Sequence, residues 1–311
     1  MTTAKLPLSA IIVTALATSA PGANASVNSL EYQLNAGVSK QDFRWDIAGS
    51  PAGTSPNILS ELTWTDLTLA QVEGDVRIPI GAAFLELGGR YGKIFKGENQ
   101  DSDYLSDNRA DEFSRSNNSG DEGTAMMLRM ALGTHYSIRP WFVVSPHIGY
   151  QVRNLDLVMT DGNQTVDTLT NDLGPFPGLD SSYDSKWGGP FVGLHTSFRY
   201  SQKWKWFGSV RLSWDDDYRA KAQWNLRQSF SQPVSFRHYA SGSGQDLKMG
   251  FTRYFGVKHQ NRLSVTLERQ LWTGSRGTDR TFFVDGTEAS TRLNRVEWDS
   301  TSIMFNLSKA F

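Results

Sequence analysis

The sequence predicts an all-β protein: a transmembrane, antiparallel up-and-down β-barrel of about ten strands. Segments of alternating apolar and polar residues recur along the chain, as expected for strands with one apolar face. Their connections alternate between short turns and long polar stretches, which is typical of a barrel with tight periplasmic turns and long extracellular loops. The predicted strands are residues 29–39, 61–78, 82–96, 124–138, 141–155, 189–201, 204–217, 245–256, 261–273 and 297–311.

The connections and the aromatic residues support the same architecture. Short turns are predicted at 79–81, 138–140, 201–203 and 257–260, and long loops at 40–60, 97–123, 156–188, 218–244 and 274–296. An even number of strands leaves both chain ends on the periplasmic side. Aromatic residues gather near both ends of the predicted strands, as in the girdles of membrane barrels: Trp141, Phe142, Trp204, Trp206 and Phe207 near the turns, and Tyr91, Phe95, Trp214 and Trp272 near the loops. A soluble β-sandwich would have a similar composition, but it would not require this alternation of connection lengths.

The chain begins with a predicted secretory signal. Lys5 precedes an apolar stretch at 6–20, and Ala23-Asn24-Ala25 has the form of a cleavage site. We therefore expect residues 1–25 to be a signal peptide and residues 26–311 to form one outer-membrane barrel domain. The net charge of −1 argues against a nucleic-acid partner, and the absence of cysteine excludes disulfides and thiol chemistry.

The predicted inner faces of the strands are too polar for an apolar core. In 209–217, outward Val210, Leu212 and Trp214 place Asp215 and Asp217 toward the lumen. The same alternation turns charges of both signs inward, where they can pair: Glu86, Arg90, Arg129, His147, Arg153, His195, Arg199 and Glu268. We therefore predict a lumen filled by paired charges, with the two histidines belonging to that network rather than binding a metal.

Two segments resemble the omptins, a family of ten-stranded outer-membrane proteases. IGAAFLELGGRYGKIFKGENQDSDYLSD, at 80–107, resembles the omptin segment that carries an Asp-x-Asp-aromatic motif. PFPGLDSSYDSKWGGPFVGLHTSFRY, at 175–200, resembles the omptin stretch that runs from the third loop into the sixth strand. The rhythm of strands and loops matches over essentially the whole mature chain. The resemblance implies a protease that uses lipopolysaccharide for activity and cleaves near basic residues, with no other cofactor.

The resemblance also implies a catalytic site at the extracellular mouth. Omptins hold an aspartate pair on one wall and an Asp–His couple on the other, with a water activated between them. Asp101 and Asp103 match the first pair, and Tyr104 takes the aromatic position. The second wall departs from the family, because aligning its Asp-Glu-His-Tyr run with residues 215–218 places Asp217 at the histidine and Asp215 at its partner. Anchoring instead on Trp214 places Gln223 there, so neither register supplies the usual imidazole.

His238 is the histidine that could replace the missing base. Pairing of the seventh and eighth strands places His238 roughly opposite Gln223, and its alternation with 247, 249 and 251 turns it inward. His135, His147 and His195 lie too close to the periplasmic turns. The candidate catalytic residues are therefore Asp101, Asp103, Asp215, Asp217 and His238, with an imidazole accepting the water's proton.

Other roles for the charged loops remain open. Asp101, Asp103, Asp107 and Glu112 have part of an EF-hand spacing, but Leu105 and the missing glycine speak against calcium. Arg109, Arg115, Arg219 and Lys221 are candidates for contacts with lipopolysaccharide phosphates. An acidic mouth favours cationic peptides or proteins. Three functions follow: a surface binding protein on a protease scaffold, an active endopeptidase with a relocated base, and a narrow channel.

Overall fold

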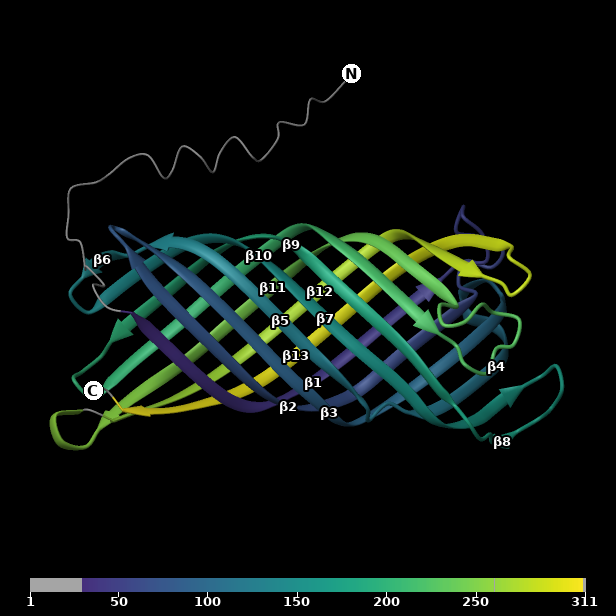
Figure 1. The fold of residues 1–311 in the computed structure, drawn as a ribbon, viewed down its shortest axis with the longest axis horizontal. Coiled ribbons are helices and arrows are strands. Elements are labelled where there is room, and N and C mark those ends of the chain that lie inside the picture. The colour runs from purple at the N-terminus through teal and green to yellow at the C-terminus, as the bar shows by residue number, and fades with distance from the viewer. Residues whose placement is uncertain (1–29, 260, 310–311) are drawn as a thin grey trace, which may run out of the picture.

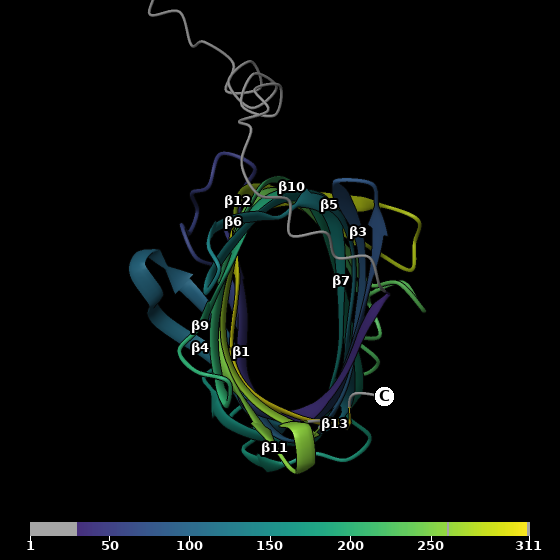
Figure 2. The ribbon, with the colours of Figure 1, turned by 90° about the vertical axis from the view of Figure 1, so that its left-hand side faces the viewer.

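The computed structural model of the chain describes residues 30–259 and 261–309, apart from the side chains at 215, 258, 308 and 309. Ten long antiparallel strands form a closed ring (Figures 1 and 2). They are β1 (Glu31–Ile47), β2 (Ser60–Ile80), β3 (Ala83–Ser106), β5 (Gly123–Thr134), β7 (Phe142–Asp167), β9 (Asp180–Arg199), β10 (Trp204–Gln223), β11 (Phe236–Phe255), β12 (Asn261–Phe282) and β13 (Glu288–Lys309). The predicted fold class is confirmed. The predicted signal peptide at 1–25 lies outside the described residues.

The ring closes between the first and last strands. β1 pairs with β13 through a register that matches Val38 with Ile303, and each other long strand pairs with its neighbour in the chain. Three short strands add to these ten. β4 (Ala110–Ser119) lies between β3 and β7 and continues the wall above β5, β6 (Tyr136–Arg139) extends it below, and β8 (Gly174–Pro175) pairs with β7. β1 begins and β13 ends at the same end of the barrel, which we take as the periplasmic end (Figure 1).

The strands are much longer than predicted. β7 has 26 residues and β3 has 24, whereas a strand needs only about 10 residues to cross a membrane. Most of the residues predicted as long extracellular loops therefore continue the barrel wall. The connections that remain at this end are 48–59, the 3₁₀ turn Asp107–Arg109, 120–122, 168–179, 224–235 and 283–287. The polar character of the strand extensions led to their prediction as loops. Outside the membrane, however, a strand has no lipid-facing side that must be apolar.

A belt of exposed apolar side chains surrounds the periplasmic part of the barrel, as expected of a surface that faces lipid. It includes Val38, Val72, Leu87, Leu128, Met130, Leu132, Ile148, Val210, Leu212, Leu247, Met249, Leu267, Ile303 and Phe305. Exposed aromatic residues lie on both sides of it: Trp141 and Trp206 near the turns, and Tyr91, Phe95 and Trp214 near the other edge. Trp272 is only 1% exposed and lies inside, so its assignment to a girdle was wrong. No helix in the described ranges is long and apolar enough to cross a membrane.

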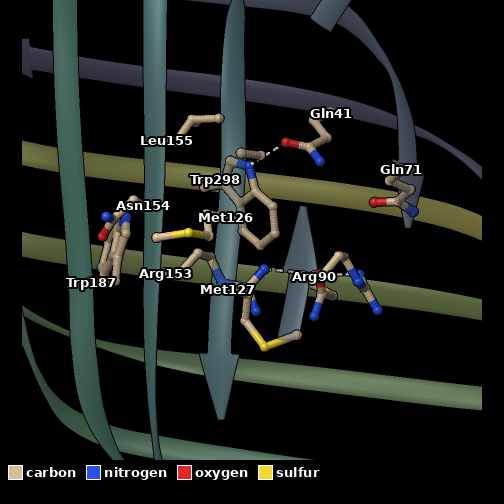
Figure 3. Close-up of a pocket in the computed structure, with 12 residues that line it drawn as sticks. Gln41, Gln71, Arg90, Met126, Met127, Arg153, Asn154, Leu155, Trp187 and Trp298 are labelled. Atoms are coloured by element: carbon tan, nitrogen blue, oxygen red, sulfur yellow. Dashed lines mark hydrogen bonds between the residues drawn. The ribbon is translucent and has the colours of Figure 1, made fainter. Parts of the chain in front are cut away.

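Paired charges fill the middle of the lumen, as the sequence predicts. Arg90 pairs with Glu73 and Glu268, and Arg211 pairs with Asp246 and Glu268. Above these pairs the guanidinium of Arg153 lies 4.8 Å from the ring centroid of Trp272 and 4.3 Å from that of Trp298. Figure 3 shows Arg153 and Trp298 among the side chains that line a small pocket here. Cations held this way are neutralised by carboxylates and by the electron-rich ring faces.

An aromatic plug closes the lumen on the extracellular side of these charges. We define it as Phe43, Trp45, Trp64, Tyr183, Trp224 and Phe236, all at most 8% exposed. Their rings are in mutual contact; for example, Trp45 stacks on Tyr183 with centroids 5.8 Å apart. Offset and edge-to-face contacts of this kind stabilise beyond the area they bury. The plug lies above the lipid-facing belt, and all of its residues except Trp64 come from segments predicted to be loops.

Candidate functional site at the barrel mouth

Asp101 and Asp103 lie together on the inner face of β3 at the mouth. β3 pairs there with β2, so that Asp101 lies opposite Leu62 and Asp103 opposite Ser60. The indole N–H of Trp224 donates a hydrogen bond to Asp101, and the guanidinium of Arg227 lies 3.6 Å from Asp103. The structure therefore brings the predicted aspartate pair together and places it against the β10–β11 connection.

The two carboxyl groups are not free to ionise independently. Burial, followed by the neighbouring charge of Asp103, raises the pKa of Asp101 to about 8. Burial also raises the pKa of Asp103, although Ser60 and Arg227 oppose the shift. At neutral pH the pair therefore holds a proton, with Asp101 as the carboxylic acid. Such a pair can both donate and accept hydrogen bonds at the mouth.

The predicted orientation of Asp217 is wrong. β10 carries a β-bulge, because its register against β11 shifts between Trp214 and Asp216, and the extra residue reverses the alternation beyond it. Asp216 is therefore fully buried and accepts a hydrogen bond from Ser213 Oγ at 2.8 Å, whereas the Asp217 side chain is 58% exposed and pairs with Arg219. The side chain of Asp215 lies outside the described residues.

His238 faces the lumen, as predicted, and lies opposite Ala220 rather than Gln223. It is 0% exposed. Its direct partner on β12 is Asp279, and Nε2 of the imidazole is 3.2 Å from Oδ1 of that carboxylate without the alignment of a hydrogen bond. Thr281 and Thr291 donate to the other oxygen of Asp279 at 3.3 and 3.1 Å and hold it in place.

Two tyrosines continue this pair into a buried polar chain. The Tyr183 hydroxyl lies 2.8 Å from Nδ1 of His238 and 2.6 Å from the Tyr218 hydroxyl. Burial raises the pKa of Tyr183 well above its usual value, so its hydroxyl remains protonated and able to donate. The four side chains come from four adjacent strands, β9 to β12. They therefore tie this side of the barrel together.

The aromatic plug separates this chain from the aspartate pair. Trp45 packs edge-on against His238 with centroids 4.7 Å apart, and Phe236 lies 5.1 Å from the same ring. Trp224, which bonds Asp101, packs on Phe236 at 4.7 Å. Rings in van der Waals contact leave no space for a water or a peptide between the two walls. His238 therefore does not share a cleft with Asp101 and Asp103.

The predicted lipopolysaccharide contacts fall into two groups. Arg109 and Arg115 lie on the β3–β4 hairpin, roughly 20 Å along the wall from Phe95, and they pair with Glu61 and Glu112. Arg219 and Lys221 lie instead on the outer surface closer to the belt, beside Lys186 and Arg237. These four cations line an open groove of about 680 Å³ across β7, β9, β10 and β11.

Asp279, Tyr183, Arg227 and the aromatic plug are not among the residues that the sequence predicts for the site. The sequence does contain a pattern that indicates part of the plug. Phe43 and Trp45, and likewise Leu62 and Trp64, alternate with polar residues as expected of strands with one apolar face. The calcium spacing finds no support: among the described residues no three His, Asp or Glu side chains converge as metal ligands. Asp107 instead accepts the backbone N–H of Asn57, and Glu112 pairs with Arg115.

Comparisons with known proteins agree with this fold. A family model described as Pom, Protochlamydia outer membrane protein, matches residues 33–311. The outer membrane protease OmpT from Escherichia coli has a TM-score of 0.72 at 13% identity, covering 90% of this chain and 96% of that chain. A FadL homologue from Pseudomonas aeruginosa reaches only 0.30 at 8% identity, covering 92% and 91%, and supports no argument. A comparison with curated protein sequences gives no match.

Proposed function

The chain belongs to the family of Protochlamydia outer membrane proteins and has the barrel fold of OmpT, and from this premise we propose that it is a surface binding protein of the outer membrane. Its acidic mouth takes cationic side chains of peptides or proteins. The observation that carries the proposal is the contact of Arg227 with Asp103 beside Asp101, together with the enclosure of His238.

Arg227 indicates what the aspartate pair binds. Its side chain is 57% exposed and comes from a connection rather than a strand, so it can leave the mouth without breaking the wall. The guanidinium of an incoming arginine would take the same place. The negative charge that the pair keeps at the rim also steers a cationic partner toward the mouth, and salt screens this attraction.

A peptide-binding assay tests the proposal. The protein is refolded in detergent with lipopolysaccharide, and binding of a fluorescent dibasic peptide is measured. Asp101→Asn with Asp103→Asn should weaken binding roughly tenfold, because the negative charge that pairs with a cation is lost. The matched control is Asp121→Asn, which removes an exposed carboxylate outside the pair. Equal binding by the double variant and the control would contradict the proposal.

An active endopeptidase is the second candidate, and the His238–Asp279 pair favours it. A carboxylate that orients an imidazole is the usual arrangement around a general base. Catalysis would require the plug to open so that His238 reaches a water near Asp101. Mass spectrometry of the peptide after incubation decides this question. Cleavage that His238→Ala abolishes would support the endopeptidase, and an intact peptide would leave the binding protein.

A narrow channel is the third candidate, and it is favoured by a large cavity at the periplasmic end. This vestibule has a volume of about 600 Å³ and is lined mainly by charged and polar side chains. The paired charges and the aromatic plug stand between it and the mouth. Conductance of the protein in planar bilayers, compared with a variant that has a thinner plug, tests whether ions pass.

Lipopolysaccharide is the proposed lipid partner of the outer surface. The groove lined by Lys186, Arg219, Lys221 and Arg237 lies just beyond Trp214 and the belt, where phosphates would meet the wall. Asp217 and Asp184 partly neutralise two of these cations. Lys186→Met with Arg237→Met should reduce retention of lipopolysaccharide on gel filtration, whereas Arg115→Met, higher on the wall, should not.

A further inference from the structure

The vestibule at the periplasmic end contains two cations that form no ion pair with a carboxylate of the described residues. Six cationic side chains line this cavity, against four carboxylates. Arg77, Arg129, Arg211 and Lys248 each pair with a carboxylate. Lys205 and Arg262 have no carboxylate at ion-pair distance among the described residues. Lys205 and Arg262 therefore differ from the other four lysine and arginine side chains of the cavity, which are all paired.

A third cation and an aromatic ring join these two. Arg199 is the backbone partner of Lys205, and its guanidinium lies 5.3 Å from the centroid of Tyr254. Tyr254 is in turn the backbone partner of Arg262. We call Arg199, Lys205, Tyr254 and Arg262 the rim cluster. It spans β9 to β12 close to their periplasmic ends, and Lys205 and Arg262 lie roughly 10 Å apart across two strands.

Hydroxyl groups complete the surroundings of this cluster. Thr252 and Ser264 line the same cavity, and their hydroxyls lie 2.9 Å apart. Only one of the two protons is needed for that bond, so the other can be donated to a ligand. Arg262 Nε is buried and has no hydrogen-bond partner within the part of the chain that the structure describes. An unpaired donor next to unpaired charge is costly unless water or an anion satisfies it.

From this arrangement we propose that the rim cluster binds a soluble phosphate group, as inorganic phosphate or a phosphomonoester, that enters from the periplasm. A tetrahedral oxyanion has several acceptor oxygens, which match the fork of Arg262, the point charge of Lys205 and the hydroxyl of Thr252 or Ser264. Glu31 is the nearby carboxylate, and it is already paired with Arg77 at 3.7 Å. The cavity volume suits a small solute.

Titration calorimetry with inorganic phosphate tests the proposal on the full protein in a maltoside detergent free of phospholipid. The wild type should bind phosphate, and Arg262→Met or Lys205→Met should weaken binding roughly ten- to a hundredfold, as expected for loss of a charge-assisted hydrogen bond. Lys203→Met is the matched control, because Lys203 is an exposed cation of the adjacent turn. Binding that all three substitutions leave unchanged would overturn the proposal.

Two further arms identify the source and the chemistry of the anion. Succinate at the same concentrations should bind at least about ten times more weakly, and equal affinity would overturn the assignment to phosphate. Phosphatidylglycerol added to the micelles should not displace inorganic phosphate. If only the lipid bound, and Arg262→Met removed that binding, the site would be a headgroup site and the soluble ligand would be wrong. Heat-modified mobility on gels confirms that each variant is folded.

Discussion

His238 and Asp279 are direct cross-strand partners on β11 and β12, and both are shielded from solvent by the aromatic plug. Neighbouring side chains hold both groups in place. The Tyr183 hydroxyl contacts Nδ1 of His238, and two threonines donate hydrogen bonds to the Asp279 carboxylate. A base intended for a substrate must be reachable from the cleft. The first role of this pair is therefore to join strands, which leads to a prediction about stability.

Replacing His238 with alanine should destabilise the extracellular half of the barrel. The substitution removes one of the two hydrogen bonds of the Tyr183 hydroxyl and the imidazole beside Oδ1 of Asp279, while Tyr218, Thr281 and Thr291 keep their own bonds. The expected cost is about 1–3 kcal/mol. The near-ultraviolet circular dichroism of the plug should lose intensity at a lower temperature than in the wild type. Arg237→Met, adjacent but exposed on the outer surface, is the control and should melt normally. Equal melting of both variants would contradict the structural role.

The protonation of Asp101 predicts a pH dependence of the mouth. Its pKa is raised from 3.8 to about 8, so the folded state holds a proton that the unfolded state releases. The stability that this bound proton contributes to the folded state is therefore fully present below about pH 4 and is lost as the pH rises to about 8. Asp101→Asn should flatten the fall in melting temperature over this range, and Asp121→Asn should not. The infrared band of a protonated carboxyl group should disappear near pH 8 in the wild type and in Asp121→Asn, but not in Asp101→Asn, which lacks this carboxyl group.

Thinning the aromatic plug should open the lumen. Trp45→Ala removes ring contacts to Tyr183, Trp224, Phe236 and His238, at a cost of about 3–5 kcal/mol. Ions should then pass the extracellular half more easily, so conductance in planar bilayers should exceed that of the wild type. Trp214→Ala, which removes a lipid-facing ring, provides the comparison. An unchanged conductance would place the barrier at the layer of paired charges instead.

The β-bulge in β10 predicts which side chains can be reached from outside. The chain has no cysteine, so single cysteines can be labelled without background. Arg219→Cys and Asp217→Cys should react rapidly with a bulky polar maleimide, whereas Ala220→Cys should be protected, since Ala220 is 6% exposed. Protection of 217 together with rapid labelling at 220 would show that the alternation is not reversed.

The same bulge makes a prediction about engineered catalysis. Asp217→His places an imidazole on the outer surface beside Arg219, away from Asp101 and Asp103. Cleavage of a dibasic peptide should therefore stay at the level of the wild type. A gain in cleavage that the pH profile assigns to a group titrating near the usual pKa of histidine would mean that 217 reaches the mouth after all.

The sequence was sufficient for the features that depend on alternation and spacing. Outward Val210, Leu212 and Trp214 and inward Arg90 and Glu268 follow from a period of two. The Asp101–Asp103 pair follows instead from the resemblance to the omptins. The position of Asp217 could not be predicted in this way, because one extra residue at a bulge reverses every side chain beyond it. The plug was missed because its residues come from four strands and one connection, and only the closed ring brings Trp45 next to His238.

The length of the strands has a mechanical consequence. At about 3.3 Å per residue and a tilt near 45°, the 26 residues of β7 rise about 60 Å, of which an apolar band takes only about 25 Å. The mouth therefore stands on a stiff, hydrogen-bonded collar well above the lipid surface. A folded partner can therefore reach the mouth without contacting the lipid surface. Because the rim is already ordered before a partner binds, little conformational entropy of the rim would be lost on binding.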